Sequence, residues 1–321
     1  MEKAFRWAFI GTGRLAGEVA KEITASGRHQ IVSVYTRRPE RCAEFAGQYG
    51  AFAAGSAEEA VSRPDVDGVY IVTPHTSHEE YSITAMRAGK PVLCEKPITT
   101  DAGKAEEMLR VAREQDVYFS EAMWTWFSPI ANKVKEWLDA GEYGEILECR
   151  LNYRGQGIYY APRVTDPAVG GGALLDIGIY PITYIYRLFG EPDTIRCTGN
   201  LRNGIDMSEE IRMRYAEKEF VISVSLEDDH ETEDVTLVGT KAKTHLPHFH
   251  YANEVTLEKA DGTRETFSVY GGMLNEFDLV ASEMRAGKKE SAYVPHSATM
   301  RVMQMMDDCR AQMGLVYPFE K

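Results

Sequence analysis

The first 120 residues of the chain alternate between short apolar segments and segments with helical spacing. Runs such as RWAFIG (6–11) and IVSVYT (31–36) are apolar or rich in β-branched residues, and a helix-like segment follows each of them, for example RLAGEVAKEITAS (14–26). Strands that alternate with helices of this length form βαβ units, and successive units build one parallel sheet. The pattern therefore predicts a doubly wound α/β domain at the start of the chain.

The pattern changes after about residue 123. Between about residues 194 and 270, apolar and polar residues alternate in short runs separated by turn signals such as Asp261-Gly262, which predicts antiparallel strands. The tail (275–315) is mostly helical in pattern. A chain of 321 residues is also long for a single core. We therefore predict two domains, an α/β domain over 1–122 and an α+β domain over 123–321 with a large, mostly antiparallel open sheet.

The composition indicates which partners to expect. The formal net charge is −13, which argues against nucleic acid or an anionic membrane as a partner but not against a small substrate in a cleft. No apolar stretch reaches the roughly 18 residues of a membrane span, and the start runs into a strand without a signal-peptide pattern. The five cysteines are scattered, which is typical of buried thiols in a reducing compartment. We expect a cytoplasmic protein.

A glycine-rich turn joins the first strand to the first helix. It reads Gly11-x-Gly13-x-x-Ala16, which in a strand–turn–helix context is the fingerprint of a dinucleotide-binding Rossmann domain. The glycines allow a tight turn and close approach of a pyrophosphate, and the helix N-terminus attracts its charge. The alternative is a plain tight turn. The predicted cofactor contacts in this turn are Gly11, Thr12, Gly13, Arg14 and Leu15.

The end of the second predicted strand indicates which dinucleotide binds. NAD sites usually place an acidic residue there to hold the ribose hydroxyls, whereas this strand ends Tyr35-Thr36-Arg37-Arg38. A hydroxyl and two guanidinium groups suit a 2′-phosphate, so Thr36, Arg37 and Arg38 favour NADP. Two alternatives stay open: the arginines are solvated loop charges, or the protein uses both NADP and NAD.

Two further polar segments follow apolar strands. TPHTSH (73–78) carries Thr73, His75 and His78, and VLCEKPITT (92–100) carries Glu95 and Lys96. The carboxyl ends of parallel strands meet at one edge of a sheet, where α/β proteins bind ligands. The spacing of the two histidines fits no zinc pattern, so we expect them in the cofactor pocket and expect no metal site. A second histidine group, HLPHFH (245–250), is interpreted as loop or strand surface.

With these motifs in place, the chain resembles the glucose–fructose oxidoreductase / inositol dehydrogenase / MocA family over essentially its whole length. The motifs are GTGRLA (11–16), AGKPVLCEKP (88–97) and GGGALLDIGIY (170–180). EAMWT (121–125) and KESAYVP (289–295) are similar to the dimeric dihydrodiol dehydrogenase branch. The resemblance implies an NAD(P)-dependent oxidoreductase acting on a sugar, diol or dicarbonyl-type small molecule. It also implies a homodimer or higher homo-oligomer through the second domain's sheet.

The resemblance also implies where the chemistry takes place. It puts Lys96 beside the nicotinamide, in contact with the reacting oxygen of the substrate, where a positive charge stabilises a developing alkoxide. Asp176 and Tyr180 are four residues apart and so share one face of a helix. A free tyrosine has a pKa of about 10, and a nearby ammonium would favour its phenolate, so Tyr180 is the expected acid/base. Asp176 would pair with Lys96 or hold a substrate hydroxyl. The alternative for Asp176 and Tyr180 is helix capping and core packing.

One position departs from the branch. Trp126 stands where the branch typically has arginine, which puts its substrate preference in doubt for this chain. Trp124 and Trp126 are expected to wall the nicotinamide or the substrate, or else to pack a domain interface. Two other functions occur on this fold: NAD-dependent glycosidases, whose additional site residues we do not identify, and non-catalytic dinucleotide-binding regulators. An intact set of Lys96, Asp176 and Tyr180 argues against a regulator.

Overall fold

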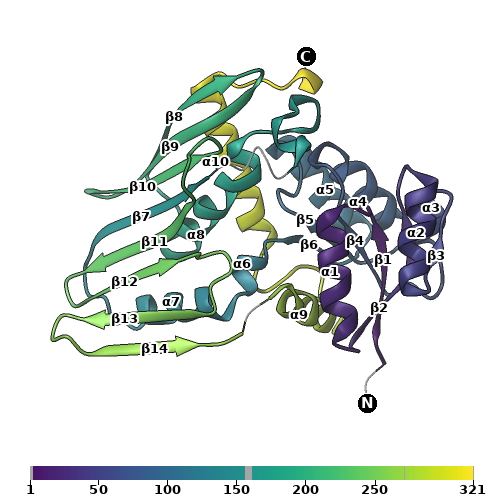
Figure 1. The fold of residues 1–321 in the computed structure, drawn as a ribbon, viewed down its shortest axis with the longest axis horizontal. Helices are drawn as coiled ribbons and strands as arrows, with labels where there is room; N and C mark the ends of the chain where they lie inside the picture. The colour runs from purple at the N-terminus through teal and green to yellow at the C-terminus, as the bar shows by residue number, and fades with distance from the viewer. Residues whose placement is uncertain (1–2, 156–160, 271, 321) are drawn as a thin grey trace. The chain divides into compact units, whose positions relative to one another are not determined.

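The computed structural model describes residues 3–155, 161–270 and 272–320 (Figure 1). Contacts between residues divide the chain into two compact units. The first unit contains Met1–Trp124 and Gly272–Met300, and the second contains Thr125–Gly271 and Arg301–Lys321. A single division at 122/123 would place the whole tail in the second domain, whereas Gly272–Met300 packs with the first unit.

The first unit is built on a six-stranded parallel sheet, as the βαβ pattern predicts. Its strand order is β3-β2-β1-β4-β5-β6, so the order reverses between β1 and β4, the position at whose carboxyl edge doubly wound sheets bind their ligands. The strands are β1 Phe5–Ile10, β2 His29–Tyr35, β3 Phe52–Ala53, β4 Gly68–Ile71, β5 Val92–Glu95 and β6 Phe119–Ala122. The connecting helices are α1 Arg14–Ala25, α2 Pro39–Tyr49, α3 Ala57–Val61, α4 His78–Arg87 and α5 Ala102–Glu114.

Helix α9 (Met273–Arg285) joins this unit through aromatic and charged contacts. The ring of Phe277 lies 5.1 Å from Trp7 and 5.0 Å from Tyr70, both fully buried. Next to it, Asp278 forms an ion pair with Arg28 at 2.7 Å and a hydrogen bond with His29 at 3.0 Å. The Trp7 indole donates to Nδ1 of His29, so Nε2 carries the proton that is donated to Asp278. These contacts explain why a segment distant in sequence belongs to the first unit.

The second unit contains an eight-stranded sheet in the order β14-β13-β12-β11-β7-β10-β9-β8. All neighbouring pairs are antiparallel except β7 and β10, which run parallel. This confirms the predicted mostly antiparallel sheet. The strands are β7 Ile146–Arg154, β8 Thr194–Arg202, β9 Ile205–Tyr215, β10 Lys218–Ser225, β11 Thr232–Gly239, β12 Ala242–Pro247, β13 Glu254–Lys259 and β14 Arg264–Ser268.

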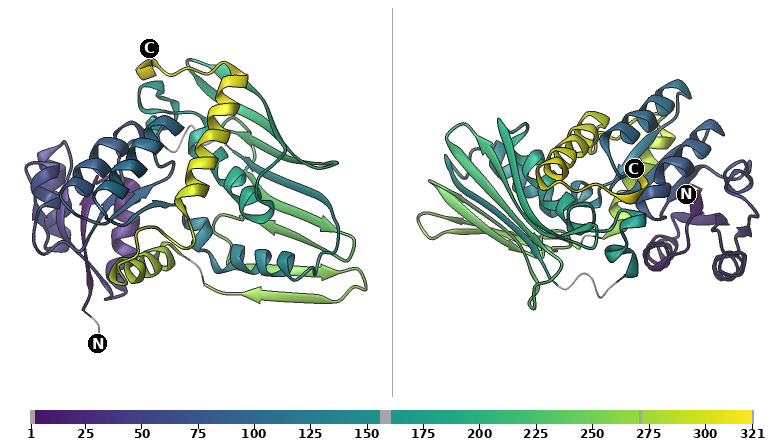
Figure 2. Two further views of the ribbon diagram at one scale, coloured as in Figure 1. Left: turned by 180° about the vertical axis from the view of Figure 1, so that it is seen from behind. Right: turned by 90° about the horizontal axis from the view of Figure 1, so that it is seen from above.

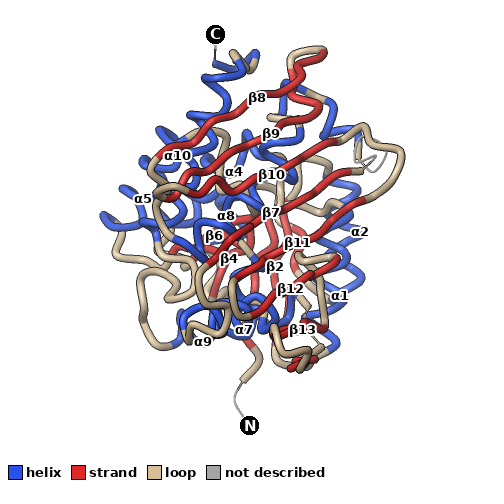
Figure 3. Tube along the Cα trace, turned by 90° about the vertical axis from the view of Figure 1, so that its left-hand side faces the viewer, coloured by secondary structure: helices blue, strands red, loops and turns tan. Residues whose placement is uncertain are grey.

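The two faces of this sheet differ in character. Ile211 and Met213 are fully buried, whereas Arg212 and Arg214 between them are exposed. Helix α8 (Ile179–Phe189) contacts β7, and α7 (Pro129–Asp139) contacts β13 and β14, on the buried face (Figure 2). The opposite face, turned to the viewer in Figure 3, carries Arg212, Arg214, and the half-buried Val221 and Ser223, as the alternation predicts.

Two remaining helices complete the chain. α6 (Trp124–Phe127) lies at the junction of the two units in the sequence, and α10 (His296–Met313) leads into the C-terminal residues. None of the helices in the described ranges has the length and apolarity needed to cross a membrane. All five cysteines are buried free thiols, as their scattered positions predict.

Candidate active site

The glycine-rich turn forms an open cradle at the start of α1. Gly11 has φ +115°, and a Cβ added there would lie 2.2 Å from the carbonyl oxygen of Val72, so only glycine fits. Gly13 is the N-cap of α1 and offers no capping side chain, and no atom lies within 4 Å of the place where its Cβ would be. The first backbone N–H groups of α1 are therefore not capped by a side chain. This arrangement fits the pyrophosphate of a dinucleotide.

The end of β2 places its polar residues where the sequence predicts. Thr36 is half-buried and Arg37 and Arg38 are exposed, just before α2 begins at Pro39. Within the described ranges, neither arginine forms an ion pair. The ring of Tyr35 lies 6.1 Å from that of Tyr81. Burial raises the pKa of Tyr81, and the Arg37 guanidinium opposes this rise, which places its charge near the two tyrosines. An anionic group at this edge would find both guanidinium groups accessible.

His78 ties together the segments that follow β4 and β5. Its ring is fully buried, with Nδ1 2.9 Å from the carbonyl oxygen of Pro97 and Nε2 2.8 Å from that of Thr73. His75 is also buried, and the two imidazole rings lie 5.8 Å apart. His78 thereby links the backbone that follows β4 to the backbone that follows β5, next to Lys96.

Lys96 follows β5 directly and is half-buried. The carboxylate of Glu95 accepts a hydrogen bond from the Tyr70 hydroxyl. Burial raises the pKa of that hydroxyl well above its usual value, and the charge of Glu95 raises it further. The hydrogen bond from Tyr70 on β4 therefore fixes the end of β5, from which Lys96 follows. This strand end lies at the same edge of the sheet as the dinucleotide turn.

Glu121 on β6 is a buried acid close to Lys96. It is 2% exposed; its Oε1 accepts from the backbone N–H of Ile98 at 2.9 Å, and its Oε2 accepts from the hydroxyl of Thr299 at 3.1 Å. Burial raises the pKa of Glu121 to about 7, while those two bonds and the Lys96 ammonium oppose the rise. Glu121 thus holds the turn after Lys96 and faces its charge. The sequence alone does not single out Glu121, because its burial depends on the segment after β5 and on Thr299 in the tail.

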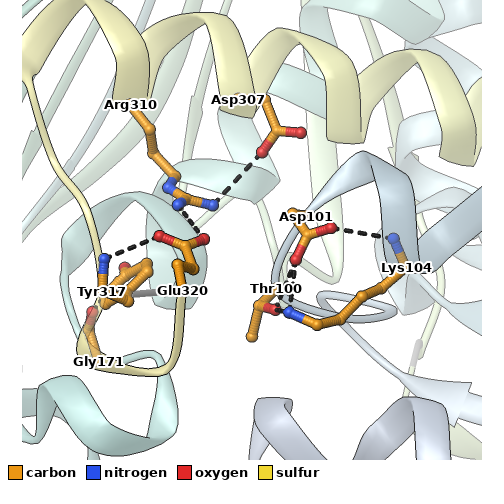
Figure 4. Close-up of polar contacts among 8 residues, drawn as sticks. All are labelled: Thr100, Asp101, Lys104, Gly171, Asp307, Arg310, Tyr317 and Glu320. Atoms are coloured by element: carbon orange, nitrogen blue, oxygen red, sulfur yellow. Dashed lines mark hydrogen bonds and ion pairs between the residues drawn. The ribbon is translucent and has the colours of Figure 1, made fainter.

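The segment beyond Lys96 ends in a capped helix. Asp101 is the N-cap of α5, and its Oδ1 accepts from the backbone N–H of Lys104 at 2.9 Å. The Lys104 ammonium donates to Asp101 Oδ2 at 2.6 Å and to the hydroxyl of Thr100 at 2.8 Å (Figure 4). The start of α5 is therefore fixed, which restrains the short connection from Lys96.

In the second unit, the glycine-rich motif makes a compact turn before α8. A Cβ on Gly171 would lie 2.6–2.9 Å from the carbonyl oxygens of Arg163, Val164 and Asp166, so a larger residue would force the turn open. The backbone N–H of Leu174 donates to Asp206 Oδ2 at 2.5 Å. The π-helical turn Leu174–Gly178 then runs into α8, and such turns are frequent at functional sites.

The C-terminal residues fasten this turn within the same unit. The hydroxyl of Tyr317 donates to the carbonyl of Gly171 at 2.8 Å, and its backbone N–H donates to Glu320 at 2.8 Å (Figure 4). Arg310 pairs with Glu320 and with Asp307 and lies 4.9 Å from the centre of the Tyr317 ring. The motif GGGALLDIGIY is thus held by side chains far along the chain.

Asp176 and Tyr180 lie on this continuous helical segment, as their spacing predicts. Asp176 Oδ1 forms an ion pair with Arg163 at 2.8 Å. Tyr180 is buried, and its ring lies 5.5 Å from that of His250 and 6.0 Å from that of Tyr153. Lys96 belongs to the first unit and Asp176 and Tyr180 to the second, so each unit carries one part of the predicted catalytic set.

The two tryptophans have different surroundings. Trp124 is half-buried and ends the first unit, whereas Trp126 is buried in the second. The guanidinium of Arg187 lies 5.4 Å from the Trp126 ring centre and donates to the Trp126 carbonyl at 2.6 Å. An arginine on α8 therefore holds Trp126 by a cation–π contact.

The histidine group at 245–250 differs at one member from the surface position that the sequence predicts. His245 and His248 are exposed, but His250 is half-buried and its Nδ1 bonds to the buried Glu233. Among the described residues, Glu231, Glu233 and His248 also bring potential metal-ligand atoms within 4.8 Å of one another. Two of those three residues are exposed, and exposed acidic groups often cluster without an ion.

Residues 5–123 match the model described as the oxidoreductase family, NAD-binding Rossmann fold, and residues 131–245 match the GFO/IDH/MocA C-terminal domain. The chain is 30% identical to trans-1,2-dihydrobenzene-1,2-diol dehydrogenase of Mus musculus, covering 99% of each chain. It is 28% identical to D-xylose 1-dehydrogenase (NADP(+)) of Hypocrea jecorina, covering 98% of this chain and 93% of that protein.

Solved structures with the same fold include a 3-ketoreductase from Actinomadura kijaniata, KijD10, in complex with NADP and TDP-benzene. It superposes with a TM-score of 0.86 at 23% identity and covers 97% of this chain and 98% of its own. An inositol dehydrogenase homologue from Azotobacter vinelandii, complexed with NADH and myo-inositol, superposes with a TM-score of 0.82 at 16% identity. These likenesses bear on the fold alone.

Proposed function

Because the chain belongs to the oxidoreductase family with an NAD-binding Rossmann fold, we propose that it transfers a hydride between a nicotinamide cofactor and a sugar, diol or dicarbonyl-type small molecule. The observation that carries the proposal is the uncapped start of α1 at Gly13, on the same sheet edge as Lys96. A cradle for pyrophosphate and a positioned ammonium at the carboxyl ends of parallel strands are what such a reaction needs.

NADP is the proposed cofactor. Thr36, Arg37 and Arg38 follow β2 with no acidic residue among them, and the exposed guanidinium groups suit a 2′-phosphate. The NADP named for the xylose dehydrogenase and for the ketoreductase complex supports this choice. When bound, the nicotinamide accepts a hydride from an alcohol carbon or gives one to a carbonyl carbon.

The chain's own residues handle the proton and the charge. In the direction of oxidation, the substrate hydroxyl loses its proton to the phenolate oxygen of Tyr180, while Lys96 stabilises the negative charge that develops on the substrate oxygen. Reduction reverses both steps, so Tyr180 gives its proton to the new alkoxide. Asp176, which forms an ion pair with Arg163, is the proposed acceptor of a hydrogen bond from a substrate hydroxyl.

The open face of the eight-stranded sheet is the proposed dimer surface. Its outward residues mix arginines with half-buried apolar and small residues, and charged neighbours such as Arg212 and Glu210 pair with each other at 2.6 Å. A second copy would cover this face, where no helix of the same unit lies within the described ranges. A cytoplasmic location is part of the proposal, and the five buried free thiols support it.

The test is turnover with purified protein. NADPH and NADP⁺ are supplied with a panel of pentoses, hexoses, cyclic polyols, trans-diols and α-dicarbonyls, and cofactor absorbance is followed in both directions. The expected result is turnover of at least one class with NADP(H). Tight NADPH binding without any turnover would instead indicate a dinucleotide-binding regulator, and the absence of binding would refute the proposal.

A further inference from the structure

Four side chains in the second unit form a connected cluster that the proposed reaction does not yet use. Glu233 on β11 and Tyr153 on β7 are direct partners across the antiparallel strand pair, so both project from the same part of the sheet. His250, three residues after β12, lies against both of them. Tyr180 from α8 completes the cluster.

Glu233 fixes His250 at two points. The Glu233 side chain is fully buried, and its Oε1 accepts from the backbone N–H of His250 at 2.9 Å and also contacts the His250 ring at Nδ1. The Glu233 backbone carbonyl accepts from the N–H of His248 at 2.6 Å. The loop after β12 is therefore bound to β11, and the imidazole has a single orientation.

This contact decides which nitrogen of His250 carries the proton. A carboxylate only accepts hydrogen bonds, so Nδ1 must be the N–H donor, and the neutral ring then has its lone pair on Nε2. The hydroxyl of Tyr153 lies 3.4 Å from Nε2 and is the donor to this neutral ring. The direction of every hydrogen bond in the chain Tyr153–His250–Glu233 is thus set by the buried carboxylate.

The rings of His250 and Tyr153 both lie next to the ring of Tyr180. The His250 ring is stacked on Tyr153 with centres 5.2 Å apart and an angle of 30°, and Tyr180 lies 5.5 Å from His250 and 6.0 Å from Tyr153. Burial raises the pKa of Tyr153, and Tyr180, Glu233 and Asp176 add to the rise, so Tyr153 stays a phenol and keeps its proton for His250.

We propose that His250, oriented by Glu233, is a positioning residue for Tyr180: it fixes the Tyr153 hydroxyl and the ring against which Tyr180 packs. The inference rests on the proposed function, in which Tyr180 exchanges a proton with the substrate. A side chain that must meet a substrate oxygen at hydrogen-bond distance loses rate when its supporting contacts loosen. The hydrogen bonds of His250 are the feature that matters, and the shape of its ring alone does not replace them.

Two substitutions at His250 separate hydrogen bonding from packing. In His250→Gln the amide can donate to Glu233 and accept from Tyr153, whereas His250→Phe keeps an aromatic ring and loses both side-chain bonds, with the backbone bond to Glu233 retained in each variant. We expect His250→Gln to retain kcat within about threefold and His250→Phe to lose roughly 10–100-fold in kcat, less than loss of a direct acid/base group, with KM and NADPH affinity little changed. The matched control is His245→Phe, an exposed histidine on β12, which should behave as wild type.

The opposite order, with His250→Phe active and His250→Gln impaired, would overturn the inference in favour of ring packing. A second measurement does not depend on turnover. Nitrogen-15 NMR of histidine-labelled protein, with His250 assigned from His250→Gln, should show the Nδ1–H form in the wild type and its loss in Glu233→Met, which has a similar length and no oxygen to accept from Nδ1. An Nε2–H form in the wild type would overturn the inference even if no substrate were found. Nδ1–H without turnover of any substrate would mean that the reaction, and with it the role assigned to His250, is wrong.

Discussion

Replacement of Glu121 by glutamine should flatten the pH dependence of stability of the first unit. The ordinary pKa of a glutamate is 4.5, and burial raises that of Glu121 to about 7. Between these values the folded state binds more protons at this site than the unfolded state, so stability falls as pH rises. The difference of 2.5 pH units corresponds to about 3 kcal/mol, because each unit is worth about 1.36 kcal/mol. The stabilisation that comes from proton binding at Glu121 is fully present below pH 4.5 and is lost by about pH 8.

Urea unfolding of the cofactor-free protein at pH 5, 6, 7 and 8 measures the effect. Glu121→Gln keeps an acceptor for the Ile98 N–H and has no charge to desolvate. Its free energy of unfolding relative to wild type should therefore rise by roughly 2–3 kcal/mol from pH 5 to pH 8, since a small part of the full effect is already lost at pH 5. Glu44→Gln, an exposed site on α2, is the control and should give a constant difference. Parallel curves for wild type and Glu121→Gln would refute the reasoning.

Two further predictions concern the cofactor and assembly. Arg37→Ala should weaken NADPH binding by roughly 10–100-fold and leave NADH binding nearly unchanged, because one charge-assisted phosphate contact is worth about 1.5–3 kcal/mol. Titration of both dinucleotides measures this, and tighter binding of NADH than of NADPH by the wild type would contradict it. Light scattering at micromolar concentration should show a dimer, and Arg212→Glu on the open sheet face should shift it toward monomer, whereas a wild-type monomer would contradict the proposed surface.

Much of the first unit could be predicted because its determinants are local. The apolar runs and the helical spacing alternate along the chain, and Gly11 and Gly13 mark the turn that the phosphate cradle needs. The predicted segments agree with the observed elements to within a few residues, for example 14–26 against Arg14–Ala25 for α1. The short β3 and α3 were missed, because two and five residues give too little periodicity to detect.

Features that depend on distant segments could not be predicted. Phe277 and Asp278 return to the first unit through contacts with Trp7 and Arg28, which no local pattern records. The same holds for His250, which the sequence groups with the surface histidines His245 and His248. The alternation of Thr232–Gly239 is the one sequence signal that Glu233 points inward. A buried glutamate needs a partner, but the sequence does not show that this partner is His250.

The predicted parallel and antiparallel sheets were both correct, but one pairing was not foreseen. A short-turn reading of the second unit gives antiparallel neighbours throughout, whereas β7 and β10 are parallel. The glycine-rich turn, α8 and two strands lie between β7 and β10 in the sequence. This long connection lets the chain return and pair β10 parallel to β7. That connection is what puts α8, with Tyr180, beside β7, with Tyr153.

The central claim is that Lys96 and Tyr180 act together on the substrate oxygen. A double-mutant cycle of Lys96→Met and Tyr180→Phe tests it most directly, with kcat for the substrate found in the panel and the NADPH dissociation constant measured for each variant. We predict that each single change keeps NADPH affinity within a few fold and lowers kcat by roughly 10²–10⁴-fold, and that the double variant is little worse than either. Normal turnover by Lys96→Met, or two losses that simply multiply, would contradict the account.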